Sequence, residues 1–484
     1  MTELVLGLDQ GTSSTRCLAF DHRLVERGAG ASPVTSSFPA PGLVEQDPGE
    51  LVASARAAIA GALEAARAEP ADVVALGIAN QTETFVLAER ASGGAVHPAL
   101  VWQDRRTADR CAALTAAGHA PFVRARTGLE LDATFPATKV AWVLDHVEGA
   151  RAAAEAGELA YFDVGGWLLR HLAGAEACEV GNAGRTLLCP LGGEEWDHEL
   201  LALFGIPRAL LPPIVASDRV ASLGDGAVTS VLGDQQASLF GLGCRAPGTA
   251  KVTLGTGAFV LAQAGTCPPD PPPGVLASCA WSLGGEKSYA LEGFVPAAGA
   301  ALDWFAGIGI LPPAGELDAV LGAAGPEDGS VVCVPALHGL GTPSWDPATR
   351  AALVGLARAT TRADVARAVV DGVLHQVADA LAAVGVGTAL ARVLLDGGMA
   401  RSDWIARRLA ELAGVRVERA AAREATARGA AMMAGLAAGW WDDIEELPAV
   451  AIDLVAEPSG PASERLERRE RWAAAVALAT GWSG

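Results

Sequence analysis

The sequence lacks the cysteine and histidine patterns that indicate disulfides or metal centres. Its eight cysteines are scattered, with no Cys-x-x-Cys pair, and most have apolar neighbours. The eight histidines are equally dispersed, and none has the spacing of metal ligands. We therefore expect reduced, buried cysteines in a cytoplasmic protein, with neither a zinc site nor a nucleophilic cysteine.

Long apolar runs and an excess of basic residues are also missing. Hydrophobic residues make up 51% of the chain, yet no uncharged apolar run reaches the length of a membrane span. Glu3 and Asp9 interrupt any apolar core of a secretion signal. The formal net charge of −20 argues against nucleic acid or an anionic membrane as a partner. A phosphate ligand would need local dipoles, a few arginines and a metal ion.

Two common nucleotide-binding motifs are absent. The chain has no Gly-Lys dipeptide, which a P-loop requires, and no Gly-x-Gly-x-x-Gly. A P-loop NTPase and a Rossmann dehydrogenase are therefore disfavoured. The length of 484 residues exceeds what one core supports and fits two domains, which we expect at residues 1–243 and 244–484.

Apolar runs and alanine-rich amphipathic segments alternate along the chain, which predicts an α/β protein. The predicted strands cover residues 73–78, 228–232, 249–254, 330–335 and 393–396. The predicted helices cover residues 50–67, 107–117, 362–384 and 404–412.

One pattern recurs: an aspartate directly follows an apolar strand in LGLDQGTSS (6–14), LGDQQAS (232–238) and LLDGGMARS (394–402). This repetition suggests two similar halves that each offer acidic strand ends to a shared cleft. Ligands of open α/β sheets bind beyond the carboxyl ends of strands. Asp9, Asp234 and Asp396 are therefore expected to converge on one site.

The first of these segments predicts a β-hairpin. An apolar run ends in Asp9, a turn of small hydroxyl residues follows, and a second apolar run begins at Cys17. Such a turn can wrap phosphate oxygens while Asp9 holds a hydrated Mg²⁺. An ordinary Gly-Thr-Ser turn fits these residues equally well.

Beginning with DQGTSSTR at residues 9–16, short motifs follow one another along nearly the whole chain. They are GLVEQDP (42–48), IANQTET (78–84), VWQDRRTA (101–108), TKVAWVLDHVEG (138–149), GDQQASLFG (233–241), TLGTGAF (253–259), YALEG (289–293), GLGTPSWDP (339–347) and DGGMARSDW (396–404). In this order they resemble the FGGY family of carbohydrate kinases, and within it the glycerol kinases most.

The resemblance implies a two-domain, actin-like ATPase fold of the ribonuclease H type, with ATP, Mg²⁺ and the acceptor meeting in an interdomain cleft. Asp234 matches the family's catalytic base, although an aspartate there would also suit a helix N-cap. Asp9 matches the Mg²⁺-associated aspartate, with Asp234 beside the metal. The residues that match nucleotide contacts are Thr12, Ser13, Ser14 and Arg16 in a first phosphate loop, Gly255 and Thr256 in a second, and Gly299, Gly397, Gly398 and Ser402 near adenine. For these glycines, tight packing turns are an alternative explanation.

The implied acceptor pocket departs from the glycerol kinase pattern at two positions. Its matching residues are Thr82, Glu83, Trp102, Thr134, Asp234, Gln235 and Phe259. Thr82 and Thr134 stand where the pattern has an arginine and a tyrosine. Losing a charged hydrogen bond to a substrate typically costs about 1.5–3 kcal/mol. The pocket then either binds glycerol weakly or has room for a longer substrate, with the threonine hydroxyls as new partners. Trp102 and Phe259 could cover the carbon skeleton, but such aromatics are often core residues.

Three functions remain open at this point. The first is ATP-dependent phosphorylation of a small polyol, glycerol to glycerol 3-phosphate. The second is a kinase for a four- or five-carbon polyol or ketose, such as erythritol, threitol or xylulose. The third is an actin-like ATPase switch without a small acceptor. The family often forms dimers or tetramers, which makes a homo-oligomer an expectation. Residues 222–230 offer no Arg or Lys to a bisphosphate, so control by fructose bisphosphate is not expected.

Overall fold

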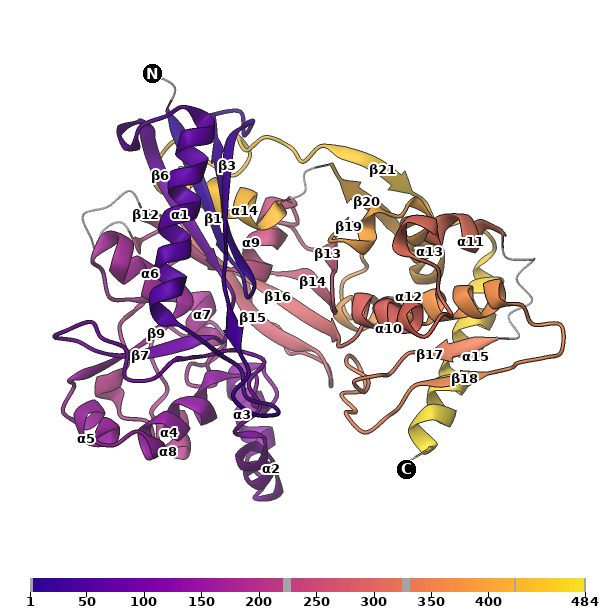
Figure 1. Ribbon diagram of the computed structural model, residues 1–484, viewed down its shortest axis with the longest axis horizontal. Coiled ribbons are helices and arrows are strands. Elements are labelled where there is room, and N and C mark those ends of the chain that lie inside the picture. Colours follow the sequence, from indigo (N-terminus) through magenta and orange to yellow (C-terminus); the bar gives the residue numbers. More distant parts are fainter. Residues whose placement is uncertain (1–2, 221–227, 324–330, 422–423, 483–484) are drawn as a thin grey trace.

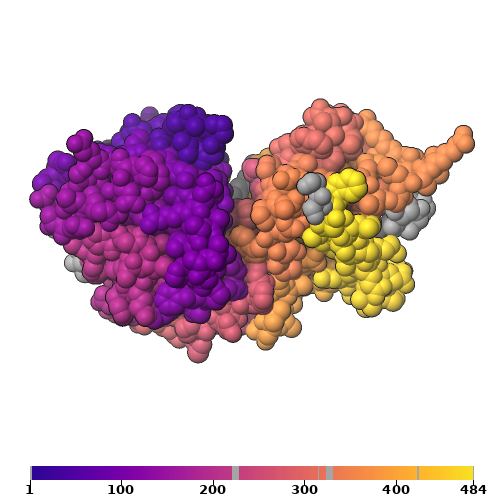
Figure 2. Space-filling view, turned by 90° about the horizontal axis from the view of Figure 1, so that it is seen from below, coloured from indigo at the N-terminus to yellow at the C-terminus, as the bar shows by residue number. Residues whose placement is uncertain are grey.

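The computed structural model describes residues 3–220, 228–323, 331–421 and 424–482. Figure 1 shows two lobes, one formed by the indigo and purple part of the chain and one by its orange part, with pink strands between them. In the space-filling view of Figure 2 the two lobes meet along a groove. Within the described ranges, no helix is long and apolar enough to cross a membrane.

The first lobe is built on a five-stranded sheet with the order β12-β6-β1-β2-β3. Strands β1, β6 and β12 are parallel, whereas β2 and β3 continue the sheet as antiparallel neighbours. The carboxyl ends of the parallel strands lie level, because Asn80 of β6 pairs with both Gln10 of β1 and Gly233 of β12. The bounds are β1 Leu4–Gln10, β2 Ser14–Phe20, β3 Glu26–Pro33, β6 Val73–Asn80 and β12 Val228–Gly233.

Helices cover both faces of this sheet. Helix α1 (Pro48–Ala66) packs on one face, where Leu6 and Leu8 join its apolar side chains. The opposite face, which carries Val5, is covered by α9 (Asp234–Gly241) and α14 (Ala425–Ala437). Alternate residues of a strand point to opposite faces, so β1 is buried on both.

Glycines allow α14 to lie directly on the sheet. A Cβ atom on Gly7 of β1 would lie 1.8 Å from the carbonyl oxygen of Ala427, and one on Gly77 of β6 would lie 2.0 Å from that of Ala430. Gly429 of α14 and Gly241 of α9 are in similarly close contact. A helix from the last part of the chain therefore covers one face of the sheet that the first part forms.

The second lobe contains a seven-stranded sheet with the order β15-β16-β14-β13-β19-β20-β21. Helix α12 (Arg362–Val384) contacts β14 and β16, and α13 (Asp403–Ala413) packs against α12 and β20. Helix α10 (Gly299–Gly307) joins the same core. The strands are β13 Thr249–Leu254, β14 Ala258–Gly265, β15 Leu276–Leu283, β16 Glu286–Val295, β19 Arg392–Asp396, β20 Arg416–Ala420 and β21 Ile452–Ala456.

A third sheet, of order β4-β5-β8-β7-β9, lies beside the first and packs on a separate core. This core also receives residues of α4 (Pro136–His146), α8 (His198–Phe204) and α7 (Val180–Gly184). The strands are β4 Ser36–Ser37, β5 Glu45–Gln46, β7 Phe85–Glu89, β8 Ala99–Leu100 and β9 Leu159–Asp163. The remaining elements are α2 Ala108–Ala116, α3 Ala120–Thr127, α5 Ala150–Glu155, α6 Val164–Ala173, β10 Cys178–Glu179, β11 Ile214–Val215, α11 Leu317–Ala323, β17 Val332–Val334, β18 Ala352–Val354 and α15 Ala462–Gly481.

The local sequence predictions are largely confirmed. All five predicted strands and all four predicted helices are present, with ends that differ by a few residues; one end, residue 330, lies outside the described residues. The predicted hairpin is formed by β1 and β2, whose turn is closed by a hydrogen bond from the Gly11 N–H to the Ser14 carbonyl. All eight cysteines are free, and all but Cys267 are buried. The division at residue 243 stays a prediction.

The packing of α14 makes Gly77 sensitive to a single added methyl group. We expect Gly77→Ala to lower the free energy of unfolding by about 1–3 kcal/mol, because the Ala430 carbonyl must move. Gly307→Ala is the matched control, since a Cβ there meets no atom within 4 Å. Chemical denaturation of both variants checks this. Equal stability of the two would contradict the close packing.

Candidate active site

Three strand ends bring aspartates to one region, as the recurring pattern predicted. Asp9 lies in β1, Asp234 directly follows β12, and Asp396 ends β19. Asp9 and Asp234 are close enough to repel each other, and Ser238 of α9 donates a hydrogen bond to Asp396 Oδ2 at 3.2 Å. Elements of both lobes therefore meet at this acidic centre.

Asp9 has an unusual protonation equilibrium for an aspartate. Burial raises its pKa to about 7, and the negative charges of Asp234 and Glu424 add to this effect, while Arg16 partly opposes it. A cation bound beside this carboxylate would stabilise its ionised form. This property fits the Mg²⁺-associated role that the sequence suggested for Asp9.

Asp234 also titrates above its ordinary range. Burial raises its pKa to about 6; Lys251 opposes this shift and Glu83 adds to it. The residue before it, Gly233, is the N-cap of α9 and forms no side-chain cap. The Asp234 carboxylate accepts from the backbone N–H of the adjacent Gln235 at 2.7 Å, and Asp234 is the first residue of α9 rather than its cap, so the N-cap interpretation is wrong. A carboxylate with this pKa can accept a proton near neutral pH.

Lys251 is a buried cation at this centre that sequence reasoning missed. It lies on β13, and its Nζ donates to Gln235 Oε1 at 2.6 Å and to Thr253 Oγ1 at 2.9 Å. Burial lowers its pKa, while Asp396 and Asp234 act in the opposite direction. Since its bond engages the amide oxygen of Gln235, the amide NH₂ of Gln235 is directed elsewhere, toward Asp234 Oδ2 at 3.5 Å.

The turn that the sequence identifies as the first phosphate loop is held by side-chain amides. Gln46 donates to the Thr12 carbonyl at 2.6 Å, and Gln81 donates to Gln46 Oε1 at 3.0 Å. The Thr12 hydroxyl accepts from Trp102 Nε1 at 3.0 Å. Ser13 is exposed and Ser14 partly buried. Gln46 and Gln81 lie in the sequence motifs at residues 42–48 and 78–84. Membership in these motifs was the only sequence feature that pointed to a role for them.

Arg16 emerges from the same hairpin but is bound to an acid. Its Nη1 donates to Glu424 Oε1 at 2.6 Å, and both side chains are partly exposed. Glu424 is the N-cap residue of α14. An incoming phosphate would therefore compete with Glu424 for this guanidinium.

The second predicted phosphate loop is the turn between β13 and β14. The Gly255 N–H bonds to the Gly257 carbonyl, and the Gly299 N–H bonds to the Gly255 carbonyl, both at 2.9 Å. Thr256 is exposed at the tip of this turn. A Cβ on Gly299 would lie 2.7 Å from the Gly255 oxygen, so glycine is needed where α10 begins.

Gly397 and Gly398 differ in their surroundings. Gly397 has a φ of +95°, and a Cβ there would lie 2.5 Å from the Leu254 carbonyl oxygen, so the packing explanation accounts for this glycine. Gly398 is exposed, and nothing lies within 4 Å of its Cβ position, which leaves room for a ligand. Ser402 is the N-cap of α13, where its hydroxyl accepts from the Ile405 N–H at 3.1 Å and donates to Asp318.

Glu83 is the most constrained residue of the predicted acceptor pocket. It lies between β6 and β7 with a φ of +61°, a conformation that is uncommon for residues other than glycine and often marks a functional site. Its side chain is buried, and it accepts hydrogen bonds from Thr82 Oγ1 and from Arg185 Nε, both at 2.5 Å. The Thr82 hydroxyl therefore donates within the protein.

Thr134 likewise uses its hydroxyl internally, because Oγ1 donates to Asp132 at 2.6 Å. The Thr134 carbonyl accepts from the buried Lys139, which also binds the Val101 carbonyl at 3.1 Å. Lys139 thus ties the segment before Trp102 to the Thr134 loop, and burial lowers its pKa to about 7.

The two aromatic residues of the predicted pocket are only partly buried. Trp102 directs its indole N–H to Thr12, and Phe259 of β14 packs on Phe294 of β16 with ring centroids 5.0 Å apart. Partial exposure beside the polar groups above fits pocket walls better than core positions.

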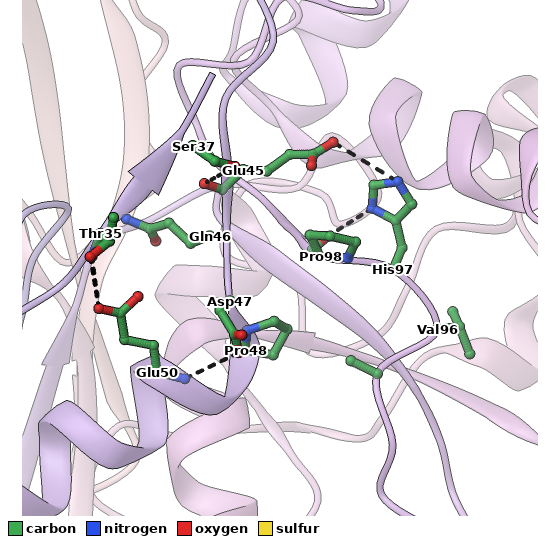
Figure 3. Close-up of a pocket in the computed structure, with 11 residues that line it drawn as sticks. Thr35, Ser37, Glu45, Gln46, Asp47, Pro48, Glu50, Val96, His97 and Pro98 are labelled. Atoms are coloured by element: carbon green, nitrogen blue, oxygen red, sulfur yellow. Dashed lines mark hydrogen bonds and ion pairs between the residues drawn. The ribbon is translucent and has the colours of Figure 1, made fainter. Parts of the chain in front are cut away.

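A separate pocket of about 430 Å³ is lined mainly by residues 45–50 and 95–98 (Figure 3). Its acidic residues are engaged within the protein: Glu45 binds Arg106, Asp47 caps α1, and Glu50 accepts from Thr35. Gln46 lines this pocket and also bonds to the Thr12 carbonyl, but none of Asp9, Asp234 and Asp396 lines it.

The carboxylates of the acidic centre fit a metal ion that is bound partly by other ligands. In the described parts of the chain, no three His, Cys, Asp or Glu residues are arranged to hold a metal by themselves. Mg²⁺ commonly binds through one or two carboxylates together with waters and substrate phosphates. Asp9 and Asp234, with pKa values raised by burial, fit that role.

The raised pKa of Asp9 predicts a stability effect. The native state holds this proton more tightly than the unfolded chain, so its contribution to stability falls as pH rises from about 4 to 7. We expect Asp9→Asn to raise the free energy of unfolding by about 1–3 kcal/mol at pH 8 without Mg²⁺, and to have little effect at pH 4. Denaturation at both pH values checks this, with exposed Asp270→Asn as control. A variant less stable than wild type at pH 8 would overturn the assignment.

Two family models cover most of the chain. Residues 4–241 match the N-terminal domain of the FGGY family of carbohydrate kinases, and residues 250–438 match its C-terminal domain.

Similar proteins cover the full length. A glycerol kinase of Aromatoleum aromaticum is 44% identical over 99% of both chains, and one of Bordetella parapertussis is 42% identical over 99% of this chain and 98% of its own. Among solved structures, Plasmodium falciparum glycerol kinase with ADP has a TM-score of 0.92 at 24% identity, covering 99% of this chain and 98% of that one. A protein named xyloylose kinase from Brucella ovis has a TM-score of 0.88 at 27% identity, covering 98% of each chain. The actin-like two-domain fold and the aspartates at its acidic centre thus belong to a chain that is a member of the FGGY family of carbohydrate kinases.

Proposed function

We propose that this kinase transfers the γ-phosphoryl group of ATP to a terminal hydroxyl of a small polyol, with glycerol as the leading acceptor and glycerol 3-phosphate as product. The observation that carries this proposal is Asp234, a carboxylate with a pKa near 6 between Asp9 and the acceptor residue Glu83. The full-length similarity to glycerol kinases supports the choice of acceptor.

The proposed step is an in-line transfer. Asp234 takes the proton of the acceptor hydroxyl while that oxygen attacks the γ-phosphorus and ADP leaves. The loops at Thr12–Ser14 and Gly255–Thr256 supply N–H and hydroxyl groups to the phosphates, and Arg16 exchanges Glu424 for a phosphate oxygen. Gly299, Gly398 and Ser402 lie on the adenine side. These roles divide between domains that we place at residues 1–243 and 244–484.

Mg²⁺ would be held by Asp9 and Asp234 together with phosphate oxygens. Its positive charge would stabilise the negative charge on the phosphoryl group during transfer. The electrostatics support that role: burial and the charge of Asp234 raise the pKa of Asp9, and a cation beside the two carboxylates would offset both effects.

The acceptor would contact Glu83, Gln235 and Asp234 through its hydroxyls and Trp102 and Phe259 through its carbons. Thr82 and Thr134 are shorter than the arginine and tyrosine of the glycerol kinase pattern, which would leave space for a longer acceptor, and their hydroxyls already donate to Glu83 and Asp132. This space is what favours a four- or five-carbon polyol or ketose as the second candidate acceptor.

Further properties of the enzyme stay proposals. We place it in the cytoplasm, where free cysteines and ATP are compatible, and we expect an oligomer of identical chains. Control by fructose bisphosphate is not expected; of the segment 222–230 that bears on it, residues 222–227 lie outside the described residues.

The base assignment predicts the effect of one substitution. Asp234→Asn is expected to abolish phosphoryl transfer and to leave ATP binding nearly intact, because the hydroxyl proton then has no acceptor. In wild type, kcat/KM is expected to fall below about pH 6, where Asp234 becomes protonated. Steady-state rates and calorimetric ATP titration check both. Near-normal turnover in the variant would remove Asp234 from this role.

The acceptor is tested by ADP release with a panel of glycerol, erythritol, threitol, ribitol, xylitol, erythrulose, ribulose and xylulose. The proposal expects glycerol to have the highest kcat/KM. A longer compound in that place would favour the second candidate, and ATP turnover that no acceptor changes would favour a switch.

The two threonines are tested by restoring the long side chains of the glycerol kinase pattern. Thr82→Arg combined with Thr134→Tyr is expected to lower the KM for glycerol about tenfold or more, since each added group can bond to a hydroxyl. An unchanged KM would show that the space beside Glu83 does not limit glycerol binding.

A further inference from the structure

Arg185 is a buried cation between two carboxylates of distant segments. It follows α7, and only 8% of its side chain is exposed. Its Nε donates to Glu83 Oε1 at 2.5 Å, and its Nη1 donates to Glu292 Oε2 at 2.6 Å. The exposed fractions of the Glu83 and Glu292 side chains are 6% and 4%. Burial alone would lower the pKa of Arg185, but Glu292 and Glu83 together raise it above its ordinary value, so the guanidinium stays charged.

The bonds to Glu83 orient its carboxylate. Thr82 donates to Oε2 and Arg185 donates to Oε1, so each oxygen has one partner from the protein. A carboxylate has about four lone-pair sites, which leaves one on each oxygen for the hydroxyls of a bound molecule. The backbone of Glu83 is already fixed by its turn at positive φ. Arg185 therefore sets the direction in which Glu83 offers its free acceptor sites.

The bond to Glu292 connects Glu83 to the sheet that carries Phe259. Glu292 lies on β16, two residues before Phe294, so the two side chains share one face of the strand. Phe294 pairs directly with Phe259 of β14, and their rings are in contact. Arg185 thus links Glu83 to strand β16, and the neighbouring strand β14 carries Phe259.

We propose that Arg185 is a positioning residue for the acceptor. It holds Glu83 of the first lobe against Glu292 of the second. In this way it sets the distance between the Glu83 carboxylate, which binds hydroxyls of the acceptor, and the Phe259 ring, which contacts its carbons. Charge-assisted bonds from one planar guanidinium can fix two carboxylates in this way, which a lysine ammonium does less well. The inference rests on the proposed function, because Glu83 is assigned to the acceptor there.

The test compares kinetic constants for the acceptor and for ATP. In Arg185→Met the KM of the best acceptor in the panel is expected to rise tenfold or more, while the KM of ATP changes less than twofold. Arg185→Lys is expected to recover part of this loss. Glu292→Gln is expected to give a smaller rise, and the double variant Arg185→Met/Glu292→Gln to be no worse than Arg185→Met alone, since both act through one link.

A matched control separates positioning from stability. Arg408 of α13 has the same exposed fraction, 8%, and is likewise shared by two carboxylates, Asp371 and Glu411. Arg408→Met is expected to lower the melting temperature without separating the two KM values. If Arg185→Met leaves the acceptor KM unchanged, or raises both KM values together, the proposal is overturned. Should Arg185→Met not fold, Arg185→Lys and Glu292→Gln decide by the same criterion.

The outcomes for the proposed function are distinct. If the wild-type enzyme prefers another polyol to glycerol, the proposed acceptor fails, and the Arg185 comparison is carried out with that polyol. If glycerol is preferred and the variants do not separate the two KM values, the proposed function stands and the role of Arg185 fails.

Discussion

The arrangement of the cleft depends on the burial of carboxylates close to one another. Asp9, Glu83, Asp234, Glu292 and Asp396 gather where strands of both lobes end or pass, and the lysine and the arginine buried among them come from different lobes. Desolvation makes this gathering costly, which is visible in the raised pKa values of Asp9 and Asp234. A polar ligand and a cation bound here would offset this electrostatic cost. The carboxylates therefore destabilise the folded protein at the place where its chemistry is proposed to occur.

Each buried cation has its own task. Lys251 lowers the pKa of Asp234 from the value that burial would give and engages the amide oxygen of Gln235. Arg185 contacts neither of these residues by hydrogen bond but fixes the carboxylate that precedes β7. A point charge suits the first position, where tuning one carboxyl is enough, and a planar fork suits the second, where two carboxylates need fixed orientations.

Local sequence patterns predicted much of the fold, but they predicted the centre of the site only in part. Apolar runs with a following aspartate placed β1, β12 and β19, because strand length and burial leave a clear signature within a few residues. The amide network behind Thr12 and the roles of Lys251 and Arg185 had no such signature. A single Gln, Lys or Arg in an apolar context is ambiguous, and Arg185 finds its partners 102 and 107 residues away. One of the two alternatives for the pocket made the threonine hydroxyls partners of a longer substrate, but they donate to Glu83 and Asp132, which lie one and two residues away.

The packing of α14 on the first sheet has a consequence for the order of synthesis. The face of β1 and β6 that carries Gly7 and Gly77 is complete only when a helix near residue 430 is available. At elongation rates of roughly 5–20 residues per second, the strands of this sheet precede that helix by roughly ten seconds or more on the ribosome. During that interval the residues of this face lack the helix on which Gly7 and Gly77 pack. The first sheet therefore cannot finish burying this face until residues 425–437 have been synthesised.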